Sequence, residues 1–303
     1  MDFPQPGMYS DWKSWAQALL TSLQAQGQNT DTLRQLLLEQ EAAANASLAS
    51  KMRHGECRLI FVSSTVVRLI PWNGDRIIVD GVERTIPAVG INLANTHAGF
   101  TTPTTDYLIY LRWNGSELEL VPSTTAHEIG PDGIRVKIGD PSQTLVGRVR
   151  INSEKLFFHQ QDIRWVISWF NRRPLSLWKA LAADVVSSNT GFSEFLGTRV
   201  NFLTWNDMPP VLQHYGIWDL ADTGAGAFTT YAIGYTDATP ATSRGYAYAY
   251  DSATPSGNNF VPFAFGSEHD FIEGAHNAAI GAACSGGSYV LKMYSTTWGH
   301  TWG

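Results

Sequence analysis

The sequence predicts a mainly β protein that begins with an α-helical segment and contains two antiparallel sandwich-like or barrel-like β-domains. Apolar residues near the start recur at helical spacing, and from residue 55 onward short β-rich runs alternate with turn-forming pairs. A chain of 303 residues is long enough for several hydrophobic cores. We expect a helical anchor at 1–54, a hairpin-rich β-domain at 55–160, a connector at 161–197 and a β-sandwich head at 198–303.

The helical prediction rests on an apolar stripe at spacings of three and four, which follows a possible N-cap at Ser10 or Asp11. After a break at 27–30, a second helix continues to about residue 52. Its short apolar seam cannot support an isolated helix, so it needs partner chains or a neighbouring surface. The alternative is a helical hairpin packed on its own domain. The candidate oligomerisation or anchor residues are Trp12, Trp15, Leu19, Leu23, Leu33 and Leu37.

Residues 55–160 show the clearest β pattern. Asp80-Gly81 and Asn114-Gly115 supply the positive φ angles that tight hairpin turns require. This region is therefore predicted to be an antiparallel sandwich or barrel. The expected strands are 58–62, 65–70, 76–79, 107–111 and 118–121.

The region after residue 160 is predicted in less detail. Residues 162–174 form an apolar run that ends in Arg172-Arg173-Pro174, which suits a strand or a short helix acting as a connector. Strands at 199–205, 228–233, 246–250 and 289–294 alternate with polar loops, which predicts a second β-sandwich.

Charge and composition restrict the function. Residues 1–199 carry 19 basic and 19 acidic side chains, whereas residues 200–303 carry two basic and eight acidic ones, which accounts for the net charge of −6. The chain lacks the cationic stripe that nucleic-acid binding needs. It also lacks a run of roughly 20 uncharged apolar residues, so membrane insertion is not expected. Two distant cysteines suggest neither a disulfide framework nor a zinc site.

The densest group of potentially reactive side chains lies at residues 269–276. On a helix, His269, Glu273 and His276 would share a face that could bind a divalent ion. Asp270 and Glu273 could also serve as a glycosidase pair, if both faced a sugar-sized cleft. The surrounding residues favour strands and loops, so a hydrogen-bonded loop is the default. We expect no metal, no cofactor and no catalytic residue.

Aromatic residues are the better candidates for ligand binding, since residues 200–303 contain 18 of the 36 Phe, Trp and Tyr residues. Tyr246, Tyr248 and Tyr250 would lie on one face of a strand, where tyrosine suits stacking on sugars or a partly wet protein interface. Trp298 and Trp302 flank His300, and Gly299, Thr301 and Gly303 leave them little local packing. For both groups the alternative is burial, in an inner sheet face or against a neighbouring chain.

Several segments between residues 1 and 173 share one overall pattern, which begins with Tyr9-Ser-Asp-Trp12. The other segments are 57–59, 62–69, 71–74, 79–81, 86–87, 107–110, 120–127, 136–140, 144–147 and 168–172. Together they resemble a module of bacteriophage tail-fibre and minor virion structural proteins.

The resemblance implies a virion structural protein, assembled in the bacterial cytoplasm as a homotrimer. It would attach through its N-terminal region to other proteins of tail, collar or head and display its C-terminal region to a host-surface glycan or protein. The module supplies no catalytic residue, so we expect no enzyme. The alternatives are a purely structural head-fibre, decoration or collar protein and, less favoured, a glycan depolymerase. A depolymerase spike usually needs a repetitive β-helix, and the sequence has no repeat of the required length.

Overall fold

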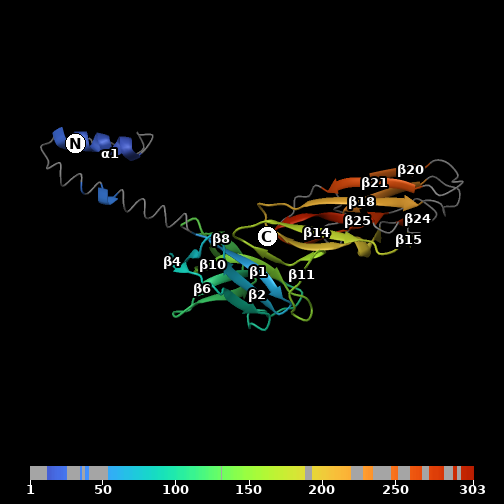
Figure 1. Cartoon of the computed structure of the whole chain (residues 1–303), viewed down its shortest axis with the longest axis horizontal. Coiled ribbons are helices and arrows are strands. Elements are labelled where there is room, and N and C mark those ends of the chain that lie inside the picture. Colours follow the sequence, from blue (N-terminus) through green and yellow to red (C-terminus); the bar gives the residue numbers. More distant parts are fainter. Residues whose placement is uncertain are drawn as a thin grey trace. The chain divides into compact units, whose positions relative to one another are not determined.

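The computed structural model comprises two compact units, Met1–His54 and Gly55–Gly303. Figure 1 shows the whole chain. The structure describes residues 12–25, 35, 38–40, 54–130, 132–187, 193–219, 228–234, 247–251, 260–267, 273–282, 289–291 and 295–303.

The first unit contains helix α1 (Trp12–Ala25). Leu19 is partly buried on this helix, and the Thr21 hydroxyl donates a hydrogen bond to the carbonyl of Gln17 at 2.9 Å. Residues 35 and 38–40 are also helical. The side chains of Trp12, Trp15 and Leu23 lie outside the described part of the structure, as do Leu33 and Leu37.

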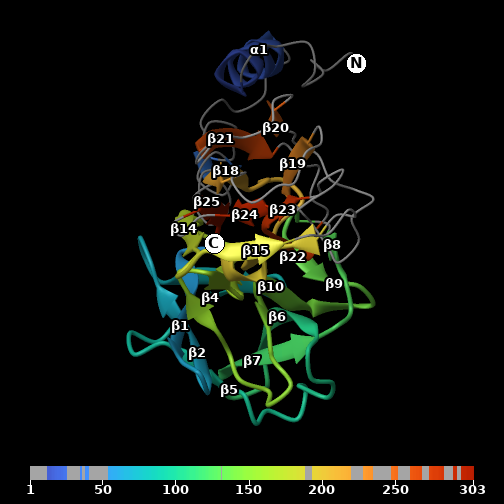
Figure 2. The same ribbon diagram turned by 90° about the vertical axis from the view of Figure 1, so that its right-hand side faces the viewer.

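The second unit begins with a group of antiparallel strands, here called the hairpin lobe. Its strands share one core, which includes Leu59, Leu69 and Ile109, all at most 3% exposed. The three-stranded sheet has the order β1 (Cys57–Ser63), β2 (Val66–Pro71), β5 (Ile91–Ala94), and β3 (Arg76–Val79) pairs with β4 (Val82–Thr85). The larger sheet has the order β7 (Leu118–Ser123), β6 (Asp106–Trp113), β10 (Asp140–Arg150), β9 (Arg135–Lys137), β8 (His127–Ile129), with β13 (Val166–Ser168) paired to β10. Figure 2 shows these strands from the side.

One of the two predicted hairpin signals forms the tight turn expected of it, whereas at Asn114-Gly115 only the glycine has a positive φ and residues 114–117 form a longer loop between β6 and β7. Asp80 and Gly81 join β3 to β4 with φ angles of 55° and 68°, the left-handed pair that a two-residue hairpin turn requires. All five strands expected between residues 58 and 121 overlap observed ones. The prediction of a mainly β chain built of antiparallel sheets is therefore confirmed.

The remaining strands form the sandwich lobe, with one parallel pair, β12 with β17. A four-stranded sheet has the order β11 (His159–Gln160), β12 (Ile163–Arg164), β17 (Val200–Thr204), β22 (Gly274–Ala278). A six-stranded sheet has the order β14 (Pro174–Ala180), β25 (Thr296–Trp302), β18 (Val211–Asp219), β24 (Tyr289–Leu291), β15 (Val185–Ser187), with β21 (Phe260–Ser267) paired to β18. A further sheet has the order β16 (Ser193–Glu194), β23 (Ile280–Ala282), β19 (Phe228–Gly234), β20 (Ala247–Asp251), and a short 3-10 helix spans Leu196–Thr198.

Residues 161–197, which were expected to be a connector, supply strands to all three sheets of the sandwich lobe. Leu177 of β14 packs with Phe202 of β17 and Leu212 of β18, so the four-stranded and six-stranded sheets share a core. A second cluster joins this lobe to the hairpin lobe. It contains Leu108, Tyr110, Leu145, Ile167, Leu175, Leu203 and Trp205. The two lobes are thus parts of one compact unit.

Strand β25 has a neighbour on each side, since it pairs with β14 along its whole length and with β18 over five residues (Figure 1). Gly299 allows β18 to come close. A Cβ atom at this position would lie 1.9 Å from the carbonyl oxygen of Val211 and 2.9 Å from the Cα of Leu212. Both atoms belong to the backbone, so only a shift of the strand could relieve the overlap.

We therefore expect Gly299→Ala to lower the free energy of unfolding by about 3 kcal/mol or more, since overpacking here forces the backbone to move. Gly81→Ala is the matched control. Gly81 has a positive φ but nothing within 4 Å of an added Cβ, so only the backbone strain of about 1 kcal/mol applies. Denaturant unfolding of both variants measures the difference, and equal losses would contradict the close approach of β25 and β18.

Candidate binding site

One face of the six-stranded sheet is exposed over β14, β25 and β18. Side chains alternate along each strand, so Leu175 and Leu177 of β14 point into the core while Ser176 and Trp178 point outward. On β18, Leu212 and His214 are buried, and Tyr215 is exposed. The outward positions of these three strands form one continuous surface.

Three aromatic side chains cross this face in a row, and we call them the aromatic surface: Trp178, Trp298 and Tyr215. Trp178 and Trp298 are directly opposite each other on β14 and β25 and are 48% and 41% exposed. The rings of Trp298 and Tyr215 have centroids 6.1 Å apart and planes inclined by 12°. Trp298 and Tyr215 therefore offer nearly parallel rings on neighbouring strands, and Trp178 adds a third ring on the strand at the other side of β25.

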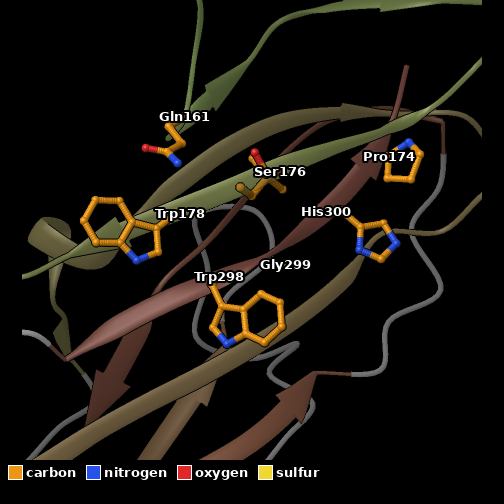
Figure 3. A pocket seen from close by; sticks show the side chains of 8 residues that line it. Gln161, Pro174, Ser176, Trp178, Trp298, Gly299 and His300 are labelled. Atoms are coloured by element: carbon orange, nitrogen blue, oxygen red, sulfur yellow. The ribbon is translucent and has the colours of Figure 1, made fainter.

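An open hollow of about 700 Å³ lies beside the two tryptophans (Figure 3). Trp178 and Trp298 lie toward one end of it and Pro174 and His300 toward the other, with Ser176 between them. Gln161 adds a carboxamide from the turn between β11 and β12. The hollow thus combines apolar ring faces with hydroxyl, amide and imidazole groups that can exchange hydrogen bonds with a ligand.

The buried face of β25 fixes this strand to its surroundings. The Thr301 hydroxyl donates a hydrogen bond to the carbonyl of Leu203 on β17 at 2.8 Å, and Thr297 Oγ1 lies 2.9 Å from His214 Nδ1. Gly303 exchanges two backbone hydrogen bonds with Arg173. Its carbonyl also accepts a bond of 2.9 Å from Nη2 of the buried Arg58 on β1. Both lobes therefore hold the strand that carries Trp298 and His300.

His159 lies in the same region and lines a small cavity of about 110 Å³ with Arg58, Arg173 and Gly303. Its ring stacks on Phe61 at a centroid distance of 5.9 Å. Burial, and then the positive charges of Arg164, Arg173 and Arg58, lower the pKa of His159 from its ordinary value of 6.5 to about 4. The imidazole is therefore neutral in the folded protein at neutral pH.

The other predicted aromatic residues lie elsewhere. Tyr248 and Tyr250 belong to β20, opposite Tyr231 and Thr229 of β19, and their side chains and Tyr246 lie outside the described residues. Trp302 pairs with Pro174, and its ring contacts His300 edge to face at 5.3 Å. Trp302 is partly buried at the margin of the exposed face, whereas Trp298 lies within the aromatic surface.

Trp178 and Tyr215 were not among the site residues predicted from the sequence. The alternation Leu175-Ser-Leu-Trp178 contained the signal for a strand with one buried and one exposed face, but the preceding Arg172-Arg173-Pro174 suggested a connector. Tyr215 lies in β18, whose residues were not assigned to a strand. Their alignment beside Trp298 depends on pairing between segments that are 120 and 83 residues apart in the sequence.

Residues 269–276 were considered for metal binding or catalysis on the assumption of a helix, but the end of this segment is a strand. Residues 274–278 form strand β22, so Glu273 and His276 do not share a helix face. Glu273 lies 3.1 Å from His127 Nε2 and from Arg148 Nη1, and it thereby joins the two lobes. His269 and Asp270 are outside the described residues. In the part of the chain that the structure describes, no three His, Cys, Asp or Glu side chains converge as metal ligands would.

Comparisons with known proteins are sparse. No protein-family model and no curated protein matches the sequence. One solved structure is similar to this chain, with 12% sequence identity and a TM-score of 0.21. The similarity covers 81% of this chain and 97% of the solved one. That structure comes from work on the promiscuous specificity of carbohydrate-binding modules of the β-sandwich superfamily. Among the described helical residues, none forms a helix long and apolar enough to cross a membrane.

The lowered pKa of His159 makes stability depend on pH. Between about pH 6.5 and 4 the unfolded chain binds a proton that the folded chain does not, so the free energy of unfolding falls as the pH drops through this range. We expect His159→Gln to have a weaker pH dependence than the wild type over the same interval. Urea unfolding at several pH values measures both slopes, and identical slopes would show that His159 is not held neutral by folding.

Proposed function

We propose that this chain is the protomer of a trimeric bacteriophage fibre or spike whose β unit binds a ligand on the host surface without cleaving it. The N-terminal region would attach to the virion, as the resemblance over residues 1–173 implies. With three copies in each fibre and several fibres on a particle, multivalent binding would compensate for a weak individual site.

The observation that carries this proposal is the aromatic surface. Trp178, Trp298 and Tyr215 are all more than a third exposed although they lie on paired strands, where inward positions are available. A contiguous exposed apolar patch with polar groups at its margin is typical of a binding site. Because the rings are fixed on a sheet, little side-chain entropy is lost when a ligand binds.

The position of Glu273 favours binding over catalysis. A sugar-cleaving acid must reach the bond to be broken. Glu273 instead interacts with His127 and Arg148, and it is not among the residues that line the hollow beside Trp178 and Trp298. None of the residues that line this hollow is Asp or Glu.

Binding to cells tests the proposal. A fluorescent fusion of the full chain should stain at least one strain in a panel of bacteria, and Trp178→Ala with Trp298→Ala should reduce the staining at least about tenfold. Trp113→Ala is the matched control, because Trp113 is 37% exposed on β6 and stacks against Arg84 in the hairpin lobe. This control should stain like the wild type.

Thermal unfolding shows whether the double variant remains folded, which we expect because both indoles are exposed. Staining that persists in the folded double variant would refute a role for the aromatic surface. Analytical ultracentrifugation at micromolar concentration tests the oligomeric state separately. A trimer is expected, and a monomer would contradict the fibre.

A further inference from the structure

The residues around the hollow indicate the chemical class of the ligand. We infer that the aromatic surface and the hollow bind an uncharged glycan chain, which crosses the strands from Tyr215 over Trp298 to Trp178. This inference rests on the proposed function and adds to it the kind of molecule that is recognised.

The rings favour a chain over a single small molecule. Neighbouring strands are about 5 Å apart, and the three rings occupy three adjacent strands, so their row extends across the sheet. Trp298 and Tyr215 have nearly parallel planes. Such a row presents successive apolar faces, on which successive sugar rings can stack through their C–H groups.

Polar side chains line the hollow beside the aromatic rings, where they can bind the hydroxyl groups of a sugar. Ser176 lies between Trp178 and His300, and Gln161 lies above this row (Figure 3). The Arg164 guanidinium donates to the carbonyl of Ser176 at 2.9 Å and to its Oγ at 3.4 Å, which holds the hydroxyl in place. Ser, Gln and His can each donate or accept a hydrogen bond, as hydroxyl recognition requires.

The lack of charged side chains in the lining of the hollow favours a neutral glycan over an acidic one. The residues lining the hollow are Gln161, Pro174, Ser176, Leu177, Trp178, Trp298, Gly299 and His300. None of these eight is Lys, Arg, Asp or Glu. The Arg164 guanidinium lies beside the hollow, but it already donates to the carbonyl and Oγ of Ser176. A carboxylate or phosphate on the ligand would lose its hydration and would have to compete with Ser176 for this guanidinium, so an anionic polysaccharide would bind less well.

Calorimetric titration of the full chain tests the inference. The probes are neutral hexasaccharides of glucose, mannose, galactose and N-acetylglucosamine, together with oligogalacturonate and a sialylated oligosaccharide as acidic counterparts. We expect at least one neutral chain to bind, a loss of about tenfold in affinity for Trp298→Ala and for Trp178→Ala, and no change for Trp113→Ala. Trp178→Tyr should recover part of the affinity because it restores a ring.

Three outcomes would overturn the inference. They are binding of acidic probes alone, binding of neutral chains that is insensitive to both tryptophan variants, and a change of oligomeric state in Trp298→Ala, which would make the face an interface between copies. Cell staining that requires both tryptophans but is not inhibited by any neutral probe would refute the glycan while leaving the proposed function intact. Absence of staining by the wild type would refute the proposed function itself.

Discussion

The aromatic surface depends on strand β25 being held from both sides. The close approach at Gly299 brings β18 against β25, and seven paired residues join β25 to β14. The buried hydroxyls of Thr297 and Thr301 bind groups of β18 and β17, and Gly303 reaches Arg58 in the hairpin lobe. Every second residue of β25 is therefore fixed inward, which leaves Trp298 and His300 facing outward at fixed positions.

This arrangement explains why the exposed rings can serve binding. Large aromatic side chains on a mobile loop would have to be ordered by the ligand, at a cost in entropy. Here the sheet orders them beforehand, and the two lobes are joined beneath it by a shared core and by the contacts of Glu273 with Arg148 and His127. The stability of the unit and the geometry of the site therefore depend on the same interactions.

Local patterns in the sequence predicted five strands of the hairpin lobe, because turns such as Asp80-Gly81 and period-two apolar runs act between neighbouring residues. They did not predict β10, which pairs with β6, β9 and β13 in the larger sheet. They were insufficient for the sandwich lobe, where β14 pairs with a strand about 120 residues later. Trp298 was a candidate because its neighbour Gly299 leaves it little local packing. Trp178 and Tyr215 could not be placed beside it, since that requires knowledge of which strands pair, and short strands separated by long segments do not encode this locally.

We expect Trp178 and Trp298 to contact the ligand together while the rest of the unit stays rigid. The most direct test is to follow the indole N–H signals by NMR while a neutral glycan chain is added. The signals of Trp178 and Trp298 should shift together, whereas that of Trp205, which is fully buried and bonded to the carbonyl of Ser168 at 3.0 Å, should stay in place. Unchanged signals from Trp178 and Trp298 in the presence of a glycan that binds the protein would contradict the account.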